Sequence, residues 1–227
     1  MSVVFVLALF FGLANHGYAE EKGLVGFWKF DEDKGNIVKD LSGNENNGKI
    51  HGAAWLGKAL KFDGVDDYVK IPASGSLNTQ AFTINIWLKT MGKFDRENYF
   101  LCSHNPLLRF FVKSGSHAIM VRWKKADASY VSYTFVTSSP ENEWMFISMV
   151  YDSNANTLTG YKNGILGVTT PVGKMQKNFG GDLNIGHNPV NKQHFNGVID
   201  EVMIYNRPLT AGEIKNYYDT QMRQFDL

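Results

Sequence analysis

The chain contains a single cysteine, Cys102, among its 227 residues. One thiol excludes an internal disulfide, so the fold has to be stabilised by its core and by any metal that it binds. Cys102 follows Tyr-Phe-Leu in a strand-like run, which predicts a small buried side chain rather than a reactive nucleophile. Cysteine-based catalysis is therefore not expected.

The chain also lacks an excess of charge of either sign. Lys and Arg number 23 against 22 for Asp and Glu, which gives a net charge of +1. Binding to nucleic-acid phosphates needs a concentrated basic face. The longest basic cluster, Arg122–Lys125, is short and is better explained as a solvated strand surface. We therefore expect no nucleic-acid partner.

Long hydrophobic runs are absent except at the N-terminus. Val3–Ala14 is apolar but too short to cross a bilayer, and Gly17-Tyr18-Ala19 then supplies the small residues of a cleavage site. This pattern predicts a signal peptide at residues 1–19 and export of the mature chain, whether secreted, periplasmic or at the cell surface. A buried N-terminal strand is the alternative. No later segment is apolar enough for a membrane span.

From Leu24 onward, short β-prone runs alternate with turns rich in Gly, Asn, Asp and Ser. This spacing predicts an all-β sandwich in one domain over residues 23–219, followed by a tail at 220–227. In one run the even-numbered residues are apolar while Trp87 falls on the opposite face, so both faces of that strand should be covered. The predicted strands are Val25–Phe30, Ala59–Phe62, Tyr68–Ile71, Phe82–Lys89, Tyr99–Ser103, Leu108–Lys113, Ala118–Trp123, Tyr130–Val136, Trp144–Asp152, Thr157–Lys162, Ile165–Thr170, Leu183–Ile185 and Gly197–Asn206.

Two local signals are specific. Asn163–Gly164 between two strands predicts a tight hairpin, because its turn needs positive φ at both central residues. One short helix is predicted near the C-terminus. Thr210 can cap it, Glu213 stands three residues later, and Leu209 and Ile214 occupy the positions of a hydrophobic staple.

Acidic residues gather near the two ends of the domain. Asp31 and Asp40 lead into a turn rich in Gly and Asn that includes Asn46, and Asp200 interrupts the apolar last strand. Ca²⁺ takes about six to eight oxygen ligands from such residues. A charge inside an apolar strand is costly unless it is paired or bound to metal. The residues alone leave two interpretations open: a Ca²⁺ site, or simple turns at Asp40 with Asp200 facing water.

The same segments carry a family resemblance over nearly the whole mature chain. The chain resembles a laminin-G-like domain of the concanavalin A-like lectin/glucanase superfamily. The matching segments are Trp28–Glu32, Asp40–Gly43, Asn46–Gly48, Gly57–Val69, Phe82–Trp87, Trp144, Tyr161–Gly164, Leu183–Gly186, Gly197–Val202 and Ile204–Leu209. The chain departs from the family pattern at Glu45, where Gly is more usual.

The resemblance implies a jelly-roll sandwich of two antiparallel sheets, often with one Ca²⁺ between the early loop and the last strand. The matching positions for its ligands are Asp40, Asn46 and Asp200, with Asp31 as a further candidate. The ion would be structural, since it would fix the first loop to the final strand. The two acidic ends of the domain are accordingly expected to lie side by side.

Catalysis is not expected. Glycoside hydrolases of this fold carry Glu-x-Asp-x-(x)-Glu on one strand, and the chain has no such string. Asp200 and Glu201 are adjacent, so in a regular strand they would point to opposite faces. A polysaccharide lyase needs clustered Arg, His and Tyr residues. The candidates for that cluster are His104, Arg109, His117, Arg122 and Tyr133, and no lyase motif surrounds them.

The aromatic residues favour recognition, because sugar rings stack on Trp and Tyr faces. Trp123 lies outside the family segments, whereas the other tryptophans match them and are expected in the core. The candidate ligand-binding residues are Arg109, Trp123, Tyr130 and Tyr133. His187, Asn188 and His194 precede the last strand and could rim such a site; an ordinary polar loop is the alternative.

The sequence therefore predicts an exported, Ca²⁺-stabilised, lectin-like module that binds a glycan or another extracellular surface ligand without chemistry of its own. The alternatives are a divergent polysaccharide lyase or glycoside hydrolase, and a protein-binding adhesion domain. An enzyme should show a groove with convergent ionisable groups, and a lectin an exposed aromatic ring beside amides. An adhesion domain should show a broad apolar patch.

Overall fold

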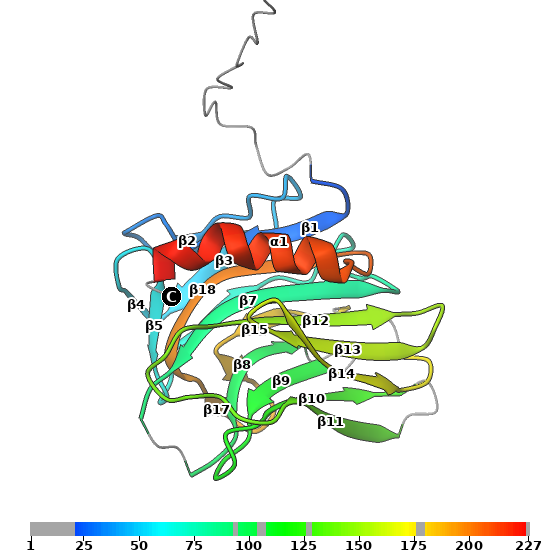
Figure 1. The fold of residues 1–227 in the computed structure, drawn as a ribbon. Coiled ribbons are helices and arrows are strands. Elements are labelled where there is room, and N and C mark those ends of the chain that lie inside the picture. The colour runs from blue at the N-terminus through cyan, green and yellow to red at the C-terminus, as the bar shows by residue number, and fades with distance from the viewer. Residues whose placement is uncertain (1–20, 93–94, 104–107, 126–128, 176–179, 226–227) are drawn as a thin grey trace, which may run out of the picture.

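A computed structural model describes residues 21–92, 95–103, 108–125, 129–175 and 180–225. These residues form two large antiparallel sheets, a small two-stranded hairpin and one C-terminal helix (Figure 1). The predicted all-β sandwich is confirmed. The expected signal peptide, residues 1–19, lies outside the described residues. None of the helices found in the described ranges is long and apolar enough to cross a bilayer.

The first sheet joins elements from both ends of the domain. Its strand order is β14-β13-β12-β7-β18-β5-β4, and β1 also pairs with β18. The expectation that the two ends of the domain lie side by side is confirmed at the level of the backbone. The strands of this sheet are β1 (Leu24–Trp28), β4 (Ala54–Trp55), β5 (Leu60–Asp63), β7 (Phe82–Thr90), β12 (Met145–Asp152), β13 (Thr157–Lys162), β14 (Ile165–Pro171) and β18 (Asn196–Tyr205).

The second sheet has the order β11-β10-β9-β8-β15-β6-β3-β2. A separate hairpin, β16 (His187–Asn188) with β17 (Gln193–His194), contacts β8. The strands of the second sheet are β2 (Ile37–Val38), β3 (Gly48–His51), β6 (Tyr68–Ile71), β8 (Asn98–Ser103), β9 (Leu108–Val112), β10 (Ile119–Lys124), β11 (Tyr130–Val136) and β15 (Leu183–Ile185). Every predicted strand is present, with small shifts at its ends, whereas β2, β3, β4, β16 and β17 were not predicted.

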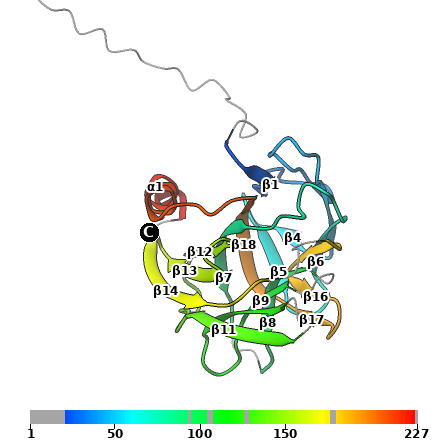
Figure 2. The ribbon, with the colours of Figure 1, turned by 90° about the vertical axis from the view of Figure 1, so that its right-hand side faces the viewer.

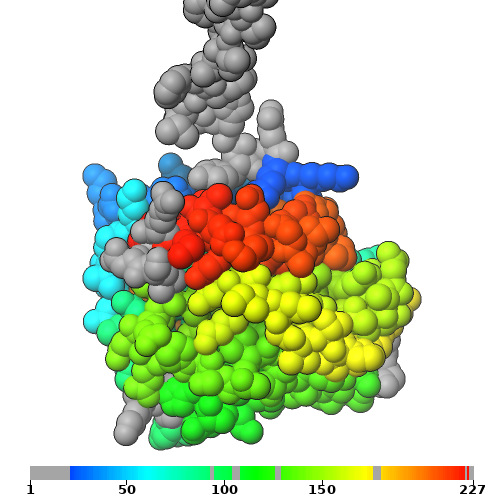
Figure 3. Space-filling model, in the orientation of Figure 1, coloured from blue at the N-terminus to red at the C-terminus, as the bar shows by residue number. Residues whose placement is uncertain are grey.

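The main core lies between the sheets, and a smaller one lies between the first sheet and helix α1 (Ala211–Gln221). Figure 2 shows α1 on the outer side of the first sheet. In Figure 3 the red atoms of α1 lie directly above the yellow atoms of β14. Strand β7 serves both cores: Ile84 and Ile86 face the second sheet, while Trp87 stacks on Tyr218 of α1 with ring centroids 5.7 Å apart. The predicted coverage of both faces of this strand is confirmed.

The helix begins as the sequence predicts. Glu213 N donates to Thr210 Oγ1 at 3.2 Å, and Thr210 N donates to Glu213 Oε2 at 2.7 Å, which closes a capping box. Arg207 pairs with Glu213 at 2.7 Å and lowers the pKa of that carboxyl to about 2. The helix ends at Gln221 and a 3₁₀ turn follows at Met222–Phe225, so part of the expected tail is helical.

Asp40 organises the loop that follows β1. Its Oδ1 accepts hydrogen bonds from the backbone N–H groups of Phe27 and Ser42, each at 2.9 Å, and its Oδ2 accepts from Asn46 N at 2.9 Å. The same carboxylate therefore binds strand β1 and both ends of the turn. Trp28 pairs with Asp40 through an isolated β-bridge on one side and with Val202 of β18 on the other.

Asn46 completes this loop from inside the protein. Its Nδ2 donates to Val25 O at 2.9 Å and to Ser76 Oγ at 3.0 Å. Trp28 Nε1 donates to the backbone carbonyl of Asn46 at 2.8 Å. Glu45, where the family pattern more often has Gly, has φ of 58°. The loop thus keeps the left-handed conformation that glycine adopts without strain, and Glu45 adopts it at some cost.

The hydrogen bonds of Asp40 predict a large loss of stability in Asp40→Ala. The change leaves three backbone N–H groups without their charged acceptor, which should lower the free energy of unfolding by about 2–4 kcal/mol. Urea denaturation in the presence of a chelator measures this loss apart from any metal. Asp66→Ala is the matched control: it removes an exposed aspartate and should change stability by less than about 0.5 kcal/mol. Equal stability of the two variants would contradict the role given to Asp40.

Candidate functional site

Polar and aromatic side chains gather on the outer face of the second sheet, the face away from the main core. Along β10 the side chains of Ile119, Val121 and Trp123 enter the core, so Arg122 and its neighbours of the same parity face outward. The hairpin β16–β17 lies over β8 on this side. Two hollows flank that hairpin, and they are the candidate functional site.

The first hollow, here called the tyrosine hollow, has a volume of about 310 Å³. Tyr68 and Lys70 of β6, Asn184 of β15 and His187 of β16 line it. Lys70 Nζ lies 2.8 Å from Asp182 Oδ2, which lowers the pKa of the Asp182 carboxyl. The hollow thus places an aromatic ring, an amide and an ion pair around one space. Gly181 and Pro189 complete its lining.

Four rings connect this hollow to the second one. His51 stacks on Tyr68 with ring centroids 4.4 Å apart and an interplanar angle of 6°. Tyr68 then contacts His187 at 5.0 Å, and His187 stacks on His194 at 4.2 Å. Burial and the nearby His194 lower the pKa of His187 to about 4, so its ring is neutral at pH 7.

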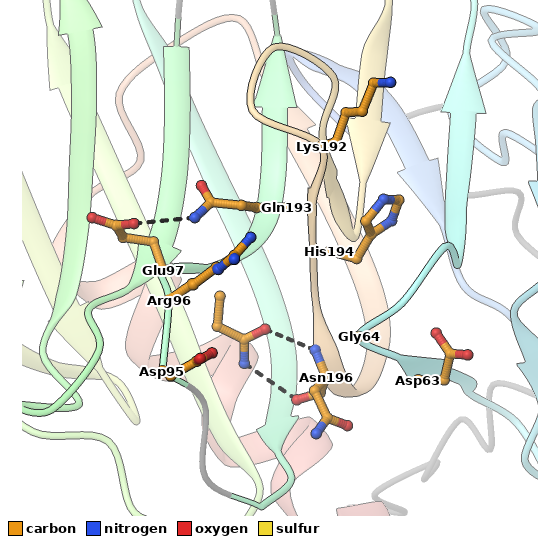
Figure 4. Close-up of a pocket in the computed structure, with 10 residues that line it drawn as sticks. Asp63, Gly64, Asp95, Arg96, Glu97, Lys192, Gln193, His194 and Asn196 are labelled. Carbon is orange, nitrogen blue, oxygen red and sulfur yellow. Dashed lines mark hydrogen bonds between the residues drawn. The ribbon is translucent and has the colours of Figure 1, made fainter.

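The second hollow, here called the polar hollow, has a volume of about 230 Å³ and is shown in Figure 4. Gln193 Nε2 donates to Glu97 Oε2 at 3.3 Å across it. Below that bond, Asn196 N donates to Asn98 Oδ1 at 2.7 Å and Asn98 Nδ2 donates to Asn196 O at 3.2 Å. Polar groups fixed in this way can bind hydroxyl groups. The remaining lining residues are Asp63, Gly64, Asp95, Arg96, Lys192 and His194.

The ligand-binding residues predicted from the sequence do not form one surface. Trp123 is fully buried in the main core and stacks on Tyr133 at 5.0 Å, so the expectation that it is exposed is wrong. Tyr133 pairs with the core-facing Val121 and lies on the inner face with it. Only Arg109 and Tyr130 are on the outer face, Arg109 buried and Tyr130 exposed, each carried there by its strand register.

The lyase candidates are not brought together either. His117 has φ of 53° at a turn and lies 3.6 Å from Glu141. Tyr133 faces inward, whereas Arg109 and Arg122 face outward. His104 lies outside the described residues. Cys102 is buried, as predicted, and burial raises the pKa of its thiol to about 12, which makes it a poor nucleophile.

The sequence does not single out Tyr68 as a site residue, and it predicts His187 and His194 only at the rim of a site. Tyr68 looked like an ordinary strand residue inside a family segment. Its outward direction depends on the register of β6 between β3 and β15, which pairs Tyr68 with His51. The sequence predicts a loop rather than a hairpin around His187 and His194, because each strand of that hairpin has only two residues.

Asp200 and Glu201 form a buried acidic pair on β18. The register shifts between Asp200 and Met203, and Glu201 has φ of 46°, so this stretch is a bulge rather than a regular strand. Burial and the neighbouring Glu201 raise the pKa of Asp200 to about 8, and burial raises that of Glu201 as well. Glu201 accepts a hydrogen bond from Tyr217 of α1, and Asp200 pairs with Trp87, which stacks on α1, so at this bulge both residues lie on the helix-covered face and the expectation for a regular strand does not hold.

The four predicted metal ligands fall into two groups. Asp31 is close enough to influence the carboxyl of Asp200, and it pairs with Lys29 at 3.4 Å. Asp40 and Asn46 use their side chains to hold the first loop. A cation near Asp200 and Glu201 would suit their chemistry, because buried carboxylates favour a positive partner, but the oxygens of Asp200, Glu201 and the exposed Asp31 do not all lie within 4.8 Å of one another. A separate group of carboxylates, Asp63, Asp66 and Asp67, has oxygens within 4.8 Å of one another on the turn after β5.

The lowered pKa of His187 predicts a loss of stability in mild acid. As the pH falls from about 6.5 to about 4, the unfolded chain takes up a proton that the folded ring resists, so the free energy of unfolding declines. The groups that face this ring are His194, Tyr68 and the Lys70–Asp182 pair. Urea midpoints across this range should fall less steeply in His187→Phe than in the unmodified protein. Parallel slopes would exclude His187 as the cause.

Solved structures show the same fold at low sequence identity. Domain 4 of AbnA, a GH43 extracellular arabinanase from Geobacillus stearothermophilus solved in complex with arabinotriose, matches with a TM-score of 0.71 and 19% identity. That match covers 87% of this chain and 98% of the arabinanase domain. The binding domain of Paraclostridial Mosquitocidal Protein 1 matches with a TM-score of 0.69 and 19% identity over 87% of this chain and 52% of that one.

The botulinum neurotoxin serotype G binding domain is similar as well, with a TM-score of 0.70 and 16% identity over 87% of this chain. The chain spans about half of that domain, 51% of its length. No curated protein sequence matches the chain. The family model Laminin_G_3 matches residues 63–215, more than half of the chain, and both sheets and the start of the helix include residues of that range. The chain therefore belongs to the concanavalin A-like lectin/glucanases superfamily.

Proposed function

We propose that this protein is an exported, non-catalytic carbohydrate-binding domain stabilised by calcium. The tyrosine hollow is the observation that carries the proposal. Tyr68 is half-buried, with His51 stacked on one ring face and His187 5.0 Å away, and the part of its ring that lines the hollow lies beside Asn184 and the Lys70–Asp182 pair. Sugars pack on accessible aromatic surface while amides and charged groups bind their hydroxyls. One structural neighbour, the arabinanase domain, was solved with arabinotriose bound.

The placement of the acidic residues favours binding over catalysis. The buried Asp200–Glu201 pair contacts α1, where Tyr217 donates to Glu201 Oε2 at 2.8 Å, and it lines neither hollow. The polar hollow does bring Asp95, Glu97 and His194 together, and this supports a hydrolase or lyase as the second candidate. Release of reducing ends or unsaturated products from a glycan that binds, lost in Glu97→Gln, would favour that second candidate.

Export is part of the proposal and rests on residues 1–19 of the sequence. Expression of the full chain in a secreting host should release a protein whose N-terminus is Glu20. A chain that stays inside the cell with its first residues attached would contradict export.

One strand carries several exposed apolar residues. Ile165, Leu166 and Val168 of β14 are exposed, and with Phe135 they line a hollow of about 360 Å³. An adhesion domain would use this surface. It lies on the edge of the first sheet, away from both candidate hollows, so Leu166→Lys should leave glycan binding unchanged.

Calcium is proposed at the buried carboxylates of Asp200 and Glu201, and Asp31, an electrostatic neighbour of both, would have to move closer to become a third ligand. Their oxygens are the ligand type that Ca²⁺ prefers. The ion would offset the charge that burial makes unfavourable and would hold β18 to the segment after β1. Asp40 and Asn46 shape that segment and need not touch the ion.

Calcium should raise the melting temperature of the mature protein. An ion that binds only the folded state contributes about 2.7 kcal/mol at a concentration of 100 times its Kd. Asp200→Asn should abolish the difference between calcium and chelator, whereas Asp40→Ala should be less stable in both conditions and keep the difference. Unchanged melting of the unmodified protein, with no copurified metal, would rule the site out.

Tyr68→Ala should weaken glycan binding by roughly 10-fold or more, which corresponds to about 1.4 kcal/mol. Tyr68→Phe keeps the ring and should retain most of the affinity. A glycan array on the mature protein identifies the ligand, and titration calorimetry then compares the variants. If Tyr130→Ala loses glycan affinity while Tyr68→Ala binds normally, the binding site lies at the β10–β11 edge of the second sheet instead.

A further inference from the structure

One row of polar side chains crosses the outer face of the second sheet. Directly paired residues of neighbouring strands lie on the same face. The register therefore places a residue from each of seven adjacent strands in line. The row consists of Lys49, Lys70, Asn184, Cys102, Arg109, Arg122 and Ser132.

The row contains an unusual pair. Arg109 of β9 and Arg122 of β10 stand directly opposite each other. Like charges in this position destabilise a sheet unless something lies between them or shields them. None of the ion pairs formed among the described residues involves Arg109 or Arg122. Among the described residues, Arg109 and Arg122 therefore stand opposite each other without an ion-pair partner.

Arg109 is also buried, with 8% of its surface exposed. Its Nε has no hydrogen-bond partner among the described groups. Arg122 is better supported, since its Nε donates to Ser132 Oγ at 2.8 Å and its guanidinium lies 5.2 Å from the Phe111 ring centroid. Burying a cation without an anion costs free energy. Another interaction, such as one with a bound ligand, has to offset this cost.

The surroundings of the pair suit a bound ligand. Arg122, Glu97 and Arg109 all act electrostatically on the buried phenol of Tyr99, and Asn188 of the β16–β17 hairpin lies beside that hydroxyl. Asn184, three strands from Arg122 along the row, lines the tyrosine hollow. Strands are spaced by about 4.8 Å, so Arg109 lies roughly 10 Å and Arg122 roughly 14 Å from Asn184. One extended ligand that reaches both places has to pass over the β16–β17 hairpin, whose Asn188 contacts Cys102 between them.

We propose that Arg109 and Arg122 form a subsite for an anionic group of the glycan, a carboxylate or a sulfate ester. The ligand of this domain is then an acidic polysaccharide lying across the strands, with one sugar at Tyr68 and a charged one at the arginine pair. Guanidinium groups bind carboxylates and sulfate-like oxyanions through paired hydrogen bonds, and Arg109 supplies a buried donor. The inference rests on the proposed carbohydrate-binding function and specifies its ligand class.

The test compares ligands that differ only in charge. Oligogalacturonate, its fully methyl-esterified form and a sulfated galactan oligosaccharide of similar length are titrated into the mature protein. The two charged ligands distinguish a carboxylate from a sulfate site, and the ester keeps the sugar without the charge. At least one charged ligand should bind 10-fold or more tightly than the ester, and its affinity should fall as NaCl rises.

Arg122→Gln should reduce binding of the charged ligand by about 10-fold and weaken its salt dependence, while binding of the ester stays the same. Lys61→Gln, which removes an exposed cation from the first sheet, is the matched control and should have no effect. Arg109→Gln should act in the same direction. Because Arg109 is buried and that variant can misfold, the half-buried member of the pair, Arg122, decides the result.

Each contrary outcome has its own meaning. Equal binding of the ester and the acid, lost in Tyr68→Ala but not in Arg122→Gln, overturns the anionic subsite and leaves the carbohydrate-binding function intact. If the unmodified protein binds none of the glycans, and Tyr68→Ala changes the binding of no ligand, the function and the subsite are overturned together. A 20-mer oligonucleotide is the remaining arm, and tighter binding of it than of any glycan, lost in Arg122→Gln, also overturns the proposal.

Discussion

The antiparallel pairing of the first strand, β1, with the last, β18, is the constraint on which the rest of the structure depends. Strand β18 lies between β7 and β5 in the first sheet and is buried almost throughout. The sheet is complete only when the two ends of the domain meet. This pairing places the loop held by Asp40 against the centre of the sheet. It also brings together residues of β1 and β18 in the smaller core, on which α1 packs. The opposite sheet is left with an outer face that no described helix covers.

The structure buries ionisable side chains in two places, acidic ones in the first sheet and a basic one in the second. Asp200 and Glu201 are buried at a bulge of the first sheet, and Arg109 is buried beside Arg122 on the second. Neither arrangement helps the chain to fold, because desolvation of a charge is unfavourable. Both are intelligible as ligand sites: a cation balances the carboxylates, and an anionic sugar balances the arginines. The first would stabilise the sandwich, and the second would select what it binds.

Much of the fold could be predicted because its signals are local. Period-two alternation located the long strands, Asn163–Gly164 located a hairpin, and Thr210 with Glu213 located the helix start. The site could not be predicted in this way. Trp123 and Arg122 are neighbours in the sequence, yet one enters the core and the other faces outward. Their direction depends on which face of the strand the other sheet covers, and that is a long-range property.

By itself, the sequence determined the all-β class and the positions of the main strands, since hydrophobic periodicity and turn chemistry act over a few residues, whereas the expected convergence of the acidic ends came from the family resemblance. Only the tertiary structure decided which acidic residues serve the loop and which stay buried near one another, because burial and pairing across β18 set their environment. It also brought Tyr68 and His187 into contact, and set Arg109 opposite Arg122. Strand register joins residues that are distant in the chain, and no local pattern encodes it.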